Sequence, residues 1–281
     1  MMTIGVIGAG TMGNGIAEAA AQVGKVILVD IDQGRAEEGR RTIEKRLNRQ
    51  VEKERIHAAT KDEILGRITA TGDLADLKDV DMVIEAALED LEVKKELFAS
   101  LGKICSADCI LGTNTSALSI TAIAAHVPKP ERVVGIHFFN PVTIMKLVEM
   151  VRTPFTSQEC LENVKAFIES LGKTAVLVEE SPGFVVNRLL IPMINEAVFL
   201  LAEGVASAED IDTAMHLGAN HPMGPLALAD LIGLDICLAI METLHMELGD
   251  DKYRPAPLLR KMVRAGRLGR KTKNGFFAFV F

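Results

Sequence analysis

The sequence predicts two domains, a doubly wound α/β domain with a mostly parallel sheet and an all-helical domain after it. Through about the first 180 residues, short β-branched and apolar runs alternate with longer amphipathic segments. Several of these runs are apolar throughout, which is typical of strands buried on both faces of a parallel sheet. After Pro182-Gly183 the strand-like runs nearly vanish. This change in composition places the two domains at residues 1–182 and 183–281.

Individual elements follow from the same patterns. Residues 33–55 are crowded with charges and poor in apolar side chains, so together with the residues up to about 66 they predict a projecting helical hairpin. Glycine and proline divide the second domain into expected helices at 184–203, 208–217, 225–248 and 257–265. The expected strands are 3–7, 26–29, 68–71, 82–85, 110–113, 133–137, 147–151 and 174–178.

Composition excludes several classes of protein. With 31 Lys and Arg against 38 Asp and Glu, the net charge is -7, which argues against nucleic acid as a partner. The most apolar long stretch, 185–201, is interrupted by Arg188 and Glu196, so no membrane span and no membrane partner are expected. The chain opens without a signal-peptide pattern, and we expect a cytoplasmic protein.

The cysteine pattern gives no sign of a metal site. Four cysteines are present without a C-x-x-C spacing, which also argues against a disulfide framework. We therefore expect buried free thiols in a reducing compartment, and no bound metal.

A glycine-rich turn carries the first sign of function. Gly8-Ala9-Gly10-Thr11-Met12-Gly13 follows an expected strand and opens an expected helix, which is the context of a Rossmann-type dinucleotide site. Asp30 ends the second strand, where its carboxylate can accept a hydrogen bond from a ribose hydroxyl and would repel a 2′-phosphate. These residues predict NAD as the cofactor, although Arg35 downstream keeps NADP use as an alternative.

A histidine at the end of another expected strand is the candidate catalytic group. His137 stands at the carboxyl end of its strand, at the sheet edge where ligands of open α/β sheets collect. Glu149 lies among apolar residues on the next strand and needs a partner if it is buried. A His137–Glu149 pair would act as a general base, whereas an edge strand would leave Glu149 facing solvent.

Several longer motifs resemble the 3-hydroxyacyl-CoA dehydrogenase family across nearly the whole chain. They are the glycine turn, Asn114-Thr115-Ser116, His137-Phe138-Phe139-Asn140-Pro141-Val142, Ser181-Pro182-Gly183-Phe184-Val185-Val186-Asn187-Arg188 and Asn220-His221-Pro222-Met223-Gly224-Pro225. The resemblance implies that His137 is the catalytic base, that Glu149 orients it, and that Ser116 and Asn187 bind the C3 oxygen of the substrate.

The resemblance also implies residues beside the cofactor and the substrate. It puts Ala86, Glu89 and Lys94 beside NAD and Asn114 near the nicotinamide, although the charges of Glu89 and Lys94 alone would indicate exposed helix positions. In the charged hairpin, Arg49 and Lys53 are the candidate contacts to the coenzyme A phosphates.

The expected reaction is therefore interconversion of (S)-3-hydroxyacyl-CoA and 3-oxoacyl-CoA by hydride transfer, with the 3-hydroxybutyryl-CoA and acetoacetyl-CoA pair as the expected substrates. Two alternatives remain, a dehydrogenase of free 3-hydroxy acids and a catalytically silent NAD-binding protein. Apolar helix surface at 192–194 and 232–241 predicts a homodimer or higher homo-oligomer formed through the second domain.

Overall fold

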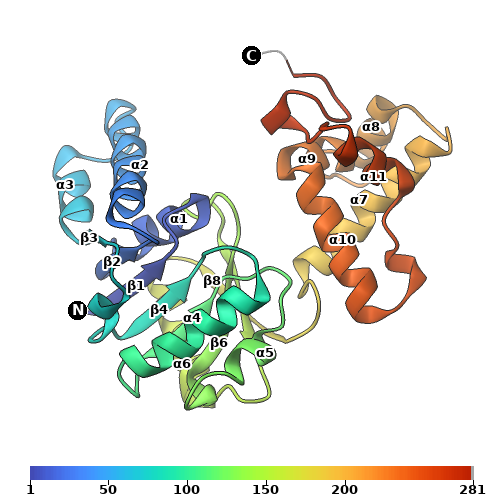
Figure 1. Ribbon diagram of the computed structural model, residues 1–281. Helices are drawn as coiled ribbons and strands as arrows, with labels where there is room; N and C mark the ends of the chain where they lie inside the picture. The colour runs from blue at the N-terminus through green and yellow to red at the C-terminus, as the bar shows by residue number, and fades with distance from the viewer. Residues whose placement is uncertain (280–281) are drawn as a thin grey trace. The chain divides into compact units, whose positions relative to one another are not determined.

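The chain separates into an α/β unit, Met1–Glu180, and a helical unit, Ser181–Phe281, in a computed structural model that describes residues 1–279 (Figure 1). The first unit contains one eight-stranded sheet with helices packed on it. The second is built from helices, with isolated β-bridges close to its end. The predicted fold class is confirmed.

All eight expected strands are present, with ends that differ from the prediction by at most one residue. Their order in the sheet is β3-β2-β1-β4-β5-β6-β7-β8. The strands are β1 (Thr3–Ile7), β2 (Lys25–Val29), β3 (Ile68–Thr71), β4 (Met82–Glu85), β5 (Ile110–Thr113), β6 (Val133–Phe138), β7 (Leu147–Arg152) and β8 (Thr174–Glu179).

The strand directions decide which residues share an edge of the sheet. Neighbouring strands are parallel throughout except for β6 and β7, which are antiparallel. The strand order reverses between β1 and β4, and ligands of such sheets bind outside the carboxyl ends of the strands at that point. The carboxyl ends of β1 to β6 therefore meet at one edge, which we call the cofactor edge. Because β7 runs the other way, its amino end lies at the same edge.

Helices cover the central strands of the sheet, which are buried along nearly all of their length, whereas β8 is mostly exposed. Helix α1 (Thr11–Ala20) follows β1 directly, and eight of its ten residues are buried. Its apolar side chains share one core with those of the strands and of α6. The other helices of this group are α4 (Leu91–Ile104), α5 (Ile120–Ala124) and α6 (Gln158–Ser170).

The charged segment forms α2 (Gln33–Glu52) and α3 (Ala58–Gly66), which lie side by side as a projecting hairpin (Figure 1). Four small or apolar residues at helical spacing form the buried face of α2: Ala36, Gly39, Ile43 and Leu47. Arg46 fastens α2 to α1 through an ion pair with Glu18, 2.5 Å between Nε and Oε2. Burial raises the pKa of Glu18 from its ordinary value, and the guanidinium opposes that rise.

The helical unit departs from the sequence prediction at two points. The expected helix 225–248 is wrong as a single element, because Gly233, with a φ of 109°, separates α9 from α10. The expected start at 184 is two residues early, since Phe184 has a φ of 50°. The helices are α7 (Val186–Ala202), α8 (Ala208–Gly218), α9 (Pro225–Ile232), α10 (Leu234–Leu248) and α11 (Pro257–Arg264).

Short 3₁₀ helices complete the description of the chain. They are η1 (Leu74–Leu77), η2 (Pro130–Arg132), η3 (Asp251–Tyr253) and η4 (Arg270–Thr272). Among residues 1–279, no helix is both long enough and apolar enough to span a membrane.

A buried carboxylate holds the end of the chain against the helical unit. Asp230 on α9 has no exposed surface, and its oxygens accept hydrogen bonds from the backbone amides of Phe276, at 3.0 Å, and Phe277, at 2.9 Å. Burial raises the pKa of Asp230, and the two amide donors partly offset that rise. The backbone at Gly275 lies so close to the carboxylate of Asp230 that a Cβ there would be 1.8 Å from Oδ1.

Replacing this carboxylate is expected to destabilise the helical unit. Asp230→Ala leaves two partly buried amides without their acceptor, at about 1–3 kcal/mol each. We expect the free energy of unfolding to fall by about 2–6 kcal/mol, measured by urea denaturation with circular dichroism because the chain has no tryptophan. Asp79→Ala, at an exposed position, is the control. Equal stability of the two variants would contradict this assignment.

Candidate active site

The glycine turn after β1 is shaped by close packing at two of its three glycines. Gly8 has a φ of 93°, and a Cβ there would lie 2.6 Å from the carbonyl oxygen of Ala86. A Cβ on Gly13 would lie 1.6 Å from Gly8 O. A Cβ on Gly10 would have no heavy atom within 4 Å. The first and third glycines thus let the turn and helix pack, while the second leaves open space above the turn.

The start of α1 has the features of an anion site suited to a dinucleotide. Gly10 is the N-cap residue, and it supplies no side chain to cap the helix. No acidic residue lies in the first turn, where Thr11 is exposed and Met12 is partly buried. Backbone amides at such a helix start bind phosphate favourably, so the residues present fit the pyrophosphate of NAD.

Asp30 lies beside the glycine turn because β2 pairs with β1. Its Oδ2 accepts a hydrogen bond from the amide of Ala9, and its Oδ1 accepts one from the amide of Ile31, both at 2.7 Å. These bonds hold a carboxylate at the cofactor edge, where a ribose hydroxyl could donate to it.

Residues after β4 and β5 continue the same edge. Ala86 donates its amide to Ile7 O at 2.7 Å, and Asn114 donates its amide to Glu85 O at 2.7 Å. The side-chain oxygen of Asn114 accepts from the amide of Phe138 at 2.8 Å, which ties the end of β5 to the end of β6. The ends of four strands thus place four candidate cofactor residues at one edge: Gly8, Asp30, Ala86 and Asn114.

His137 and Glu149 face each other across the antiparallel pair β6 and β7. The strand register places the two residues directly opposite, and Nδ1 of His137 lies 2.8 Å from Oε2 of Glu149. Both are buried, with 5% of His137 and 1% of Glu149 exposed. The ring of Phe139 packs against the imidazole at 4.5 Å between centroids. The alternative in which Glu149 faces solvent is wrong, because β8 and not β7 is the outermost strand on this side of the sheet.

Ser116 lies in the loop after β5, where Glu89 holds it. The Glu89 Oε1 atom accepts from the amide of Ser116 at 2.9 Å, from its hydroxyl at 3.3 Å, and from the hydroxyl of Thr115 at 2.6 Å. The farther end of the loop is also fixed, since Ser119 donates its hydroxyl to Glu180 at 2.9 Å.

Lys94 differs from what its charge alone indicates. The interpretation of Lys94 as an exposed helix charge is wrong, because 1% of the residue is exposed and its ammonium lies 2.5 Å from Glu85 Oε1. Its position in the sequence does indicate burial, since Lys94 shares one face of α4 with Phe98 and Leu101. Glu89 is exposed, as its charge alone indicates, but it precedes α4 and is not a helix position. Sequence reasoning did not select Glu85, which ends an apolar strand.

The remaining candidates belong to other elements. Asn187 is in the first turn of α7 in the helical unit, next to Arg188, whose guanidinium donates to Ser181 Oγ at 2.8 Å and Tyr253 Oη at 3.3 Å. Arg49 and Lys53 are exposed at the end of α2, in the hairpin.

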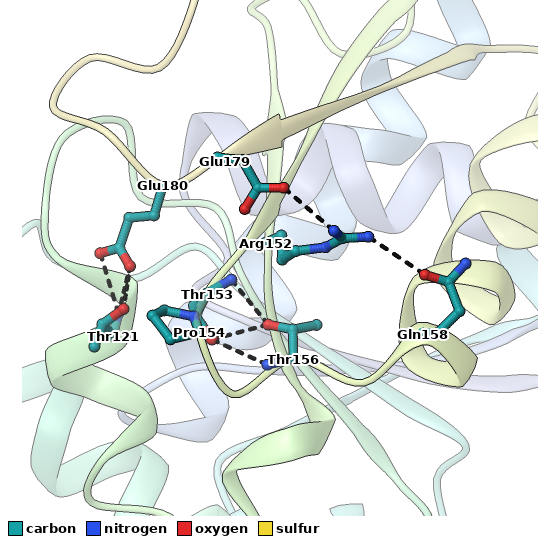
Figure 2. Close-up of a pocket in the computed structure, with 8 residues that line it drawn as sticks. All are labelled: Thr121, Arg152, Thr153, Pro154, Thr156, Gln158, Glu179 and Glu180. Carbon is teal, nitrogen blue, oxygen red and sulfur yellow. Dashed lines mark hydrogen bonds and ion pairs between the residues drawn. The ribbon is translucent and has the colours of Figure 1, made fainter.

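A cavity of about 460 Å³ lies at the opposite edge of the sheet, where β7 and β8 end. Figure 2 shows its side chains bonded to one another: Arg152 lies between Glu179 and Gln158, and Glu180 accepts from the hydroxyl of Thr121. None of its lining residues is a candidate site residue, and only Glu180, which accepts from Ser119, is shared with the groups described above. We therefore place the candidate site at the cofactor edge.

The residues that the structure describes hold no cluster of metal ligands, and burial keeps two of the four thiols protonated. Across residues 1–279, no three His, Cys, Asp or Glu side chains are grouped so that they could hold a metal ion. The four cysteines are buried free thiols. Burial raises the pKa of Cys160 and of Cys237 to about 12, which keeps both thiols protonated and unreactive at neutral pH.

Comparison with protein families covers both units. The sequence model described as "3-hydroxyacyl-CoA dehydrogenase, NAD binding domain" matches residues 3–181, and the one described as "3-hydroxyacyl-CoA dehydrogenase, C-terminal domain" matches residues 183–279. The chain belongs to the 3-hydroxyacyl-CoA dehydrogenase family. As a member of this family it is an NAD-dependent oxidoreductase, which agrees with the fit of the glycine turn and Asp30 to NAD.

Individual members of the family are similar along their whole length. The chain is 53% identical over 279 residues to a 3-hydroxybutyryl-CoA dehydrogenase of Clostridioides difficile, covering 99% of each chain. It is 51% identical to a 3-hydroxybutyryl-CoA dehydrogenase of Bradyrhizobium diazoefficiens, covering 98% of this chain and 94% of the relative. The crystal structure of an (S)-3-hydroxybutyryl-CoA dehydrogenase from Ralstonia eutropha matches with a TM-score of 0.96 and 48% identity, covering 100% of both chains.

Neutralising Glu149 is expected to lower turnover while leaving the fold intact. Glu149→Gln keeps a hydrogen-bonding group opposite His137 but removes the charge that would stabilise an imidazolium. We expect kcat to fall roughly 100-fold or more, measured by the absorbance of NADH with acetoacetyl-CoA. Glu169→Gln, at an exposed position paired with Lys165, serves as the control and should retain wild-type kcat. A Glu149→Gln variant with wild-type kcat would refute the orienting role.

Proposed function

We propose that the protein interconverts (S)-3-hydroxyacyl-CoA and 3-oxoacyl-CoA with NAD, and that its substrates are 3-hydroxybutyryl-CoA and acetoacetyl-CoA. The observation that carries the proposal is the buried His137–Glu149 pair, 2.8 Å apart, at the edge of the sheet that also carries the glycine turn. The names of the similar proteins support the four-carbon substrate.

In the proposed mechanism His137 is the general base. Its Nδ1 is bonded to Glu149, so the proton of the substrate hydroxyl would go to Nε2. The carboxylate then stabilises the imidazolium and fixes the plane of the ring. NAD, when bound, supplies the acceptor for the hydride that leaves C3 of the substrate.

Neutral polar groups suit an oxygen that changes from hydroxyl to carbonyl. A serine hydroxyl can accept from the first form and donate to the second, and an asparagine amide can do the same. We assign this role to Ser116 and Asn187. Ser116 also has its backbone fixed by Glu89, so its hydroxyl is held in a defined position.

The cofactor residues that we propose come from the strand ends and the glycine turn. The turn would hold the pyrophosphate on the amides at the start of α1, and Asp30 would hold the adenosine ribose. The other cofactor residues in this proposal are Ala86, Glu89, Lys94 and Asn114. Lys94 is buried behind Glu89, with its ammonium 3.5 Å from Glu89 Oε2, so it would support the cofactor site from that position.

We assign the two domains different tasks. Residues 1–182 would bind NAD, with the hairpin at 33–66 presenting Arg49 and Lys53 to the coenzyme A phosphates. Both cations are exposed and suited to phosphate. Residues 183–281 would provide substrate contacts and the subunit interface. We also place the protein in the cytoplasm.

Removing the imidazole tests the mechanism. In His137→Ala, kcat for NADH oxidation by acetoacetyl-CoA is expected to fall by about 10²–10⁴-fold, because the proton transfer loses its base. The affinity for NADH, measured by its fluorescence, should stay within about twofold. His126→Ala, which removes an exposed imidazole, is the control. Unchanged kcat in His137→Ala would disprove the mechanism.

Substrate choice separates the proposal from a dehydrogenase of free 3-hydroxy acids. If the hairpin binds coenzyme A phosphates, kcat/KM for acetoacetyl-CoA should exceed that for acetoacetate by at least about 100-fold, because remote binding energy contributes to turnover. Initial rates with both compounds at saturating NADH measure the ratio. Comparable values would favour the free-acid enzyme, and no turnover with either would favour the silent NAD-binding protein.

We propose a homodimer formed through the helical unit. Several large apolar side chains of that unit are exposed, among them Leu189, Leu217, Ile236 and Met246. Two residues of the expected apolar surface, Ile194 and Met241, lie in the core of the unit instead, so they cannot contribute to a subunit interface. Light scattering at micromolar concentration should give twice the chain mass of 30.4 kDa. A monomeric mass would overturn this proposal.

A further inference from the structure

Glu85 is a fully buried carboxylate for which the proposed mechanism has no role. It is the last residue of β4, at the cofactor edge, and none of its surface is exposed. Its Oε1 accepts from the ammonium of Lys94 at 2.5 Å and from the amide of Ala87 at 2.7 Å, while Oε2 accepts from the hydroxyl of Thr113 at 2.7 Å. Such a complete set of donors is what a buried charge requires.

The same contacts fix the position of Lys94. Only 1% of Lys94 is exposed, so its ammonium cannot exchange Glu85 for water without local opening of the chain. The ammonium also lies 3.5 Å from Oε2 of Glu89. Glu85 is therefore the close partner of Lys94, and Glu89 is the more distant one.

Glu89 connects Lys94 to Ser116. One of its oxygens faces the ammonium, and the other accepts from the amide of Ser116 at 2.9 Å and from the hydroxyl of Thr115 at 2.6 Å. The side chain of Glu89 is 42% exposed, so unlike Glu85 it has room to move. A continuous series of polar contacts thus runs from Glu85 through Lys94 and Glu89 to Ser116.

We propose that Glu85 is a positioning residue for Ser116, acting through Lys94 and Glu89. The inference rests on the proposed function, because it assumes that Ser116 contacts the substrate oxygen. Without the Glu85 charge, the buried ammonium of Lys94 would draw Glu89 toward itself. Glu89 would then leave the amide and hydroxyl of Ser116, and a small displacement of a substrate contact can lower turnover by about 100-fold.

A double-mutant cycle tests this dependence on Ser116. Glu85→Gln should lower kcat with acetoacetyl-CoA and NADH by roughly 10- to 100-fold in the wild-type background. In the Ser116→Ala background, the same substitution should lower kcat by less than about threefold, because the group being positioned is already gone. A purely structural role for Glu85 would reduce kcat by the same factor in both backgrounds, and that result would overturn the inference.

Two further variants control for charge and for folding. Glu92→Gln removes an exposed charge from the same helix, where Glu92 pairs with Lys95 at the surface, and should change kcat by less than about twofold in either background. If circular dichroism shows that Glu85→Gln does not fold, Glu85→Asp replaces it in the cycle. This variant keeps the charge but shortens the side chain, which draws the carboxylate away from Lys94. Its loss of kcat, expected to be several-fold, must likewise vanish with Ser116→Ala for the inference to stand.

The cycle also separates this inference from the proposed function. If Ser116→Ala by itself leaves kcat unchanged, the proposed role of Ser116 fails and the inference fails with it. If Ser116→Ala lowers kcat but Glu85→Gln loses the same factor in both backgrounds, only the inference fails.

Discussion

The need to pair buried charge governs the arrangement of the candidate site. Glu149, Glu85 and Lys94 are each at most 1% exposed. Removing one partner of a buried ion pair costs about 3–5 kcal/mol, since the other charge is left without water or counter-charge. Each of these groups must therefore meet its partner, and the contacts of Glu149 with His137 and of Glu85 with Lys94 satisfy that need. Ion pairs on the surface, such as Lys95 with Glu92, carry no comparable constraint.

The topology of the sheet makes these pairings possible. A parallel strand in place of β7 would bring its carboxyl end to the cofactor edge, whereas the antiparallel strand brings Glu149, near its amino end, opposite His137. In the same way, the reversal of strand order between β1 and β4 sets Ala86 against Gly8. One sheet thus brings the glycine turn and the buried His137–Glu149 pair to the same edge, and residues 1–279 contain no group of three or more His, Cys, Asp or Glu side chains that could hold a metal ion.

The two networks at this edge differ in what they can do. In the first, Glu149 contacts an imidazole whose charge changes during the proposed reaction, so its carboxylate affects the energy of a chemical step. In the second, Glu85 and Lys94 neutralise each other, and in our proposal Glu85 acts by holding Glu89 and Ser116 in place. Asn114 links the two regions, because its backbone bonds to Glu85 and its side chain to the amide that follows His137.

The sequence alone determined the strands, the glycine turn and NAD, because each depends on local rules. Strand positions follow from apolar runs. The turn follows from glycines at positions where a side chain would not fit, since a Cβ on Gly13 would lie 1.6 Å from Gly8 O. The family motifs likewise consist of consecutive residues. The break at Gly233 was missed because glycine occurs both inside helices and between them, and only packing fixes its φ.

Tertiary structure alone decided which charges are buried and what they contact. Glu85 and Thr113 lie 28 residues apart, and His137 and Glu149 lie 12 apart on strands whose relative direction the sequence does not specify. A charged residue in an amphipathic helix looks the same whether it faces water or a carboxylate, which is why the charge of Lys94 alone does not indicate its burial. The physical reason is that electrostatic pairing depends on distance in space, whereas the chain fixes only distance along itself.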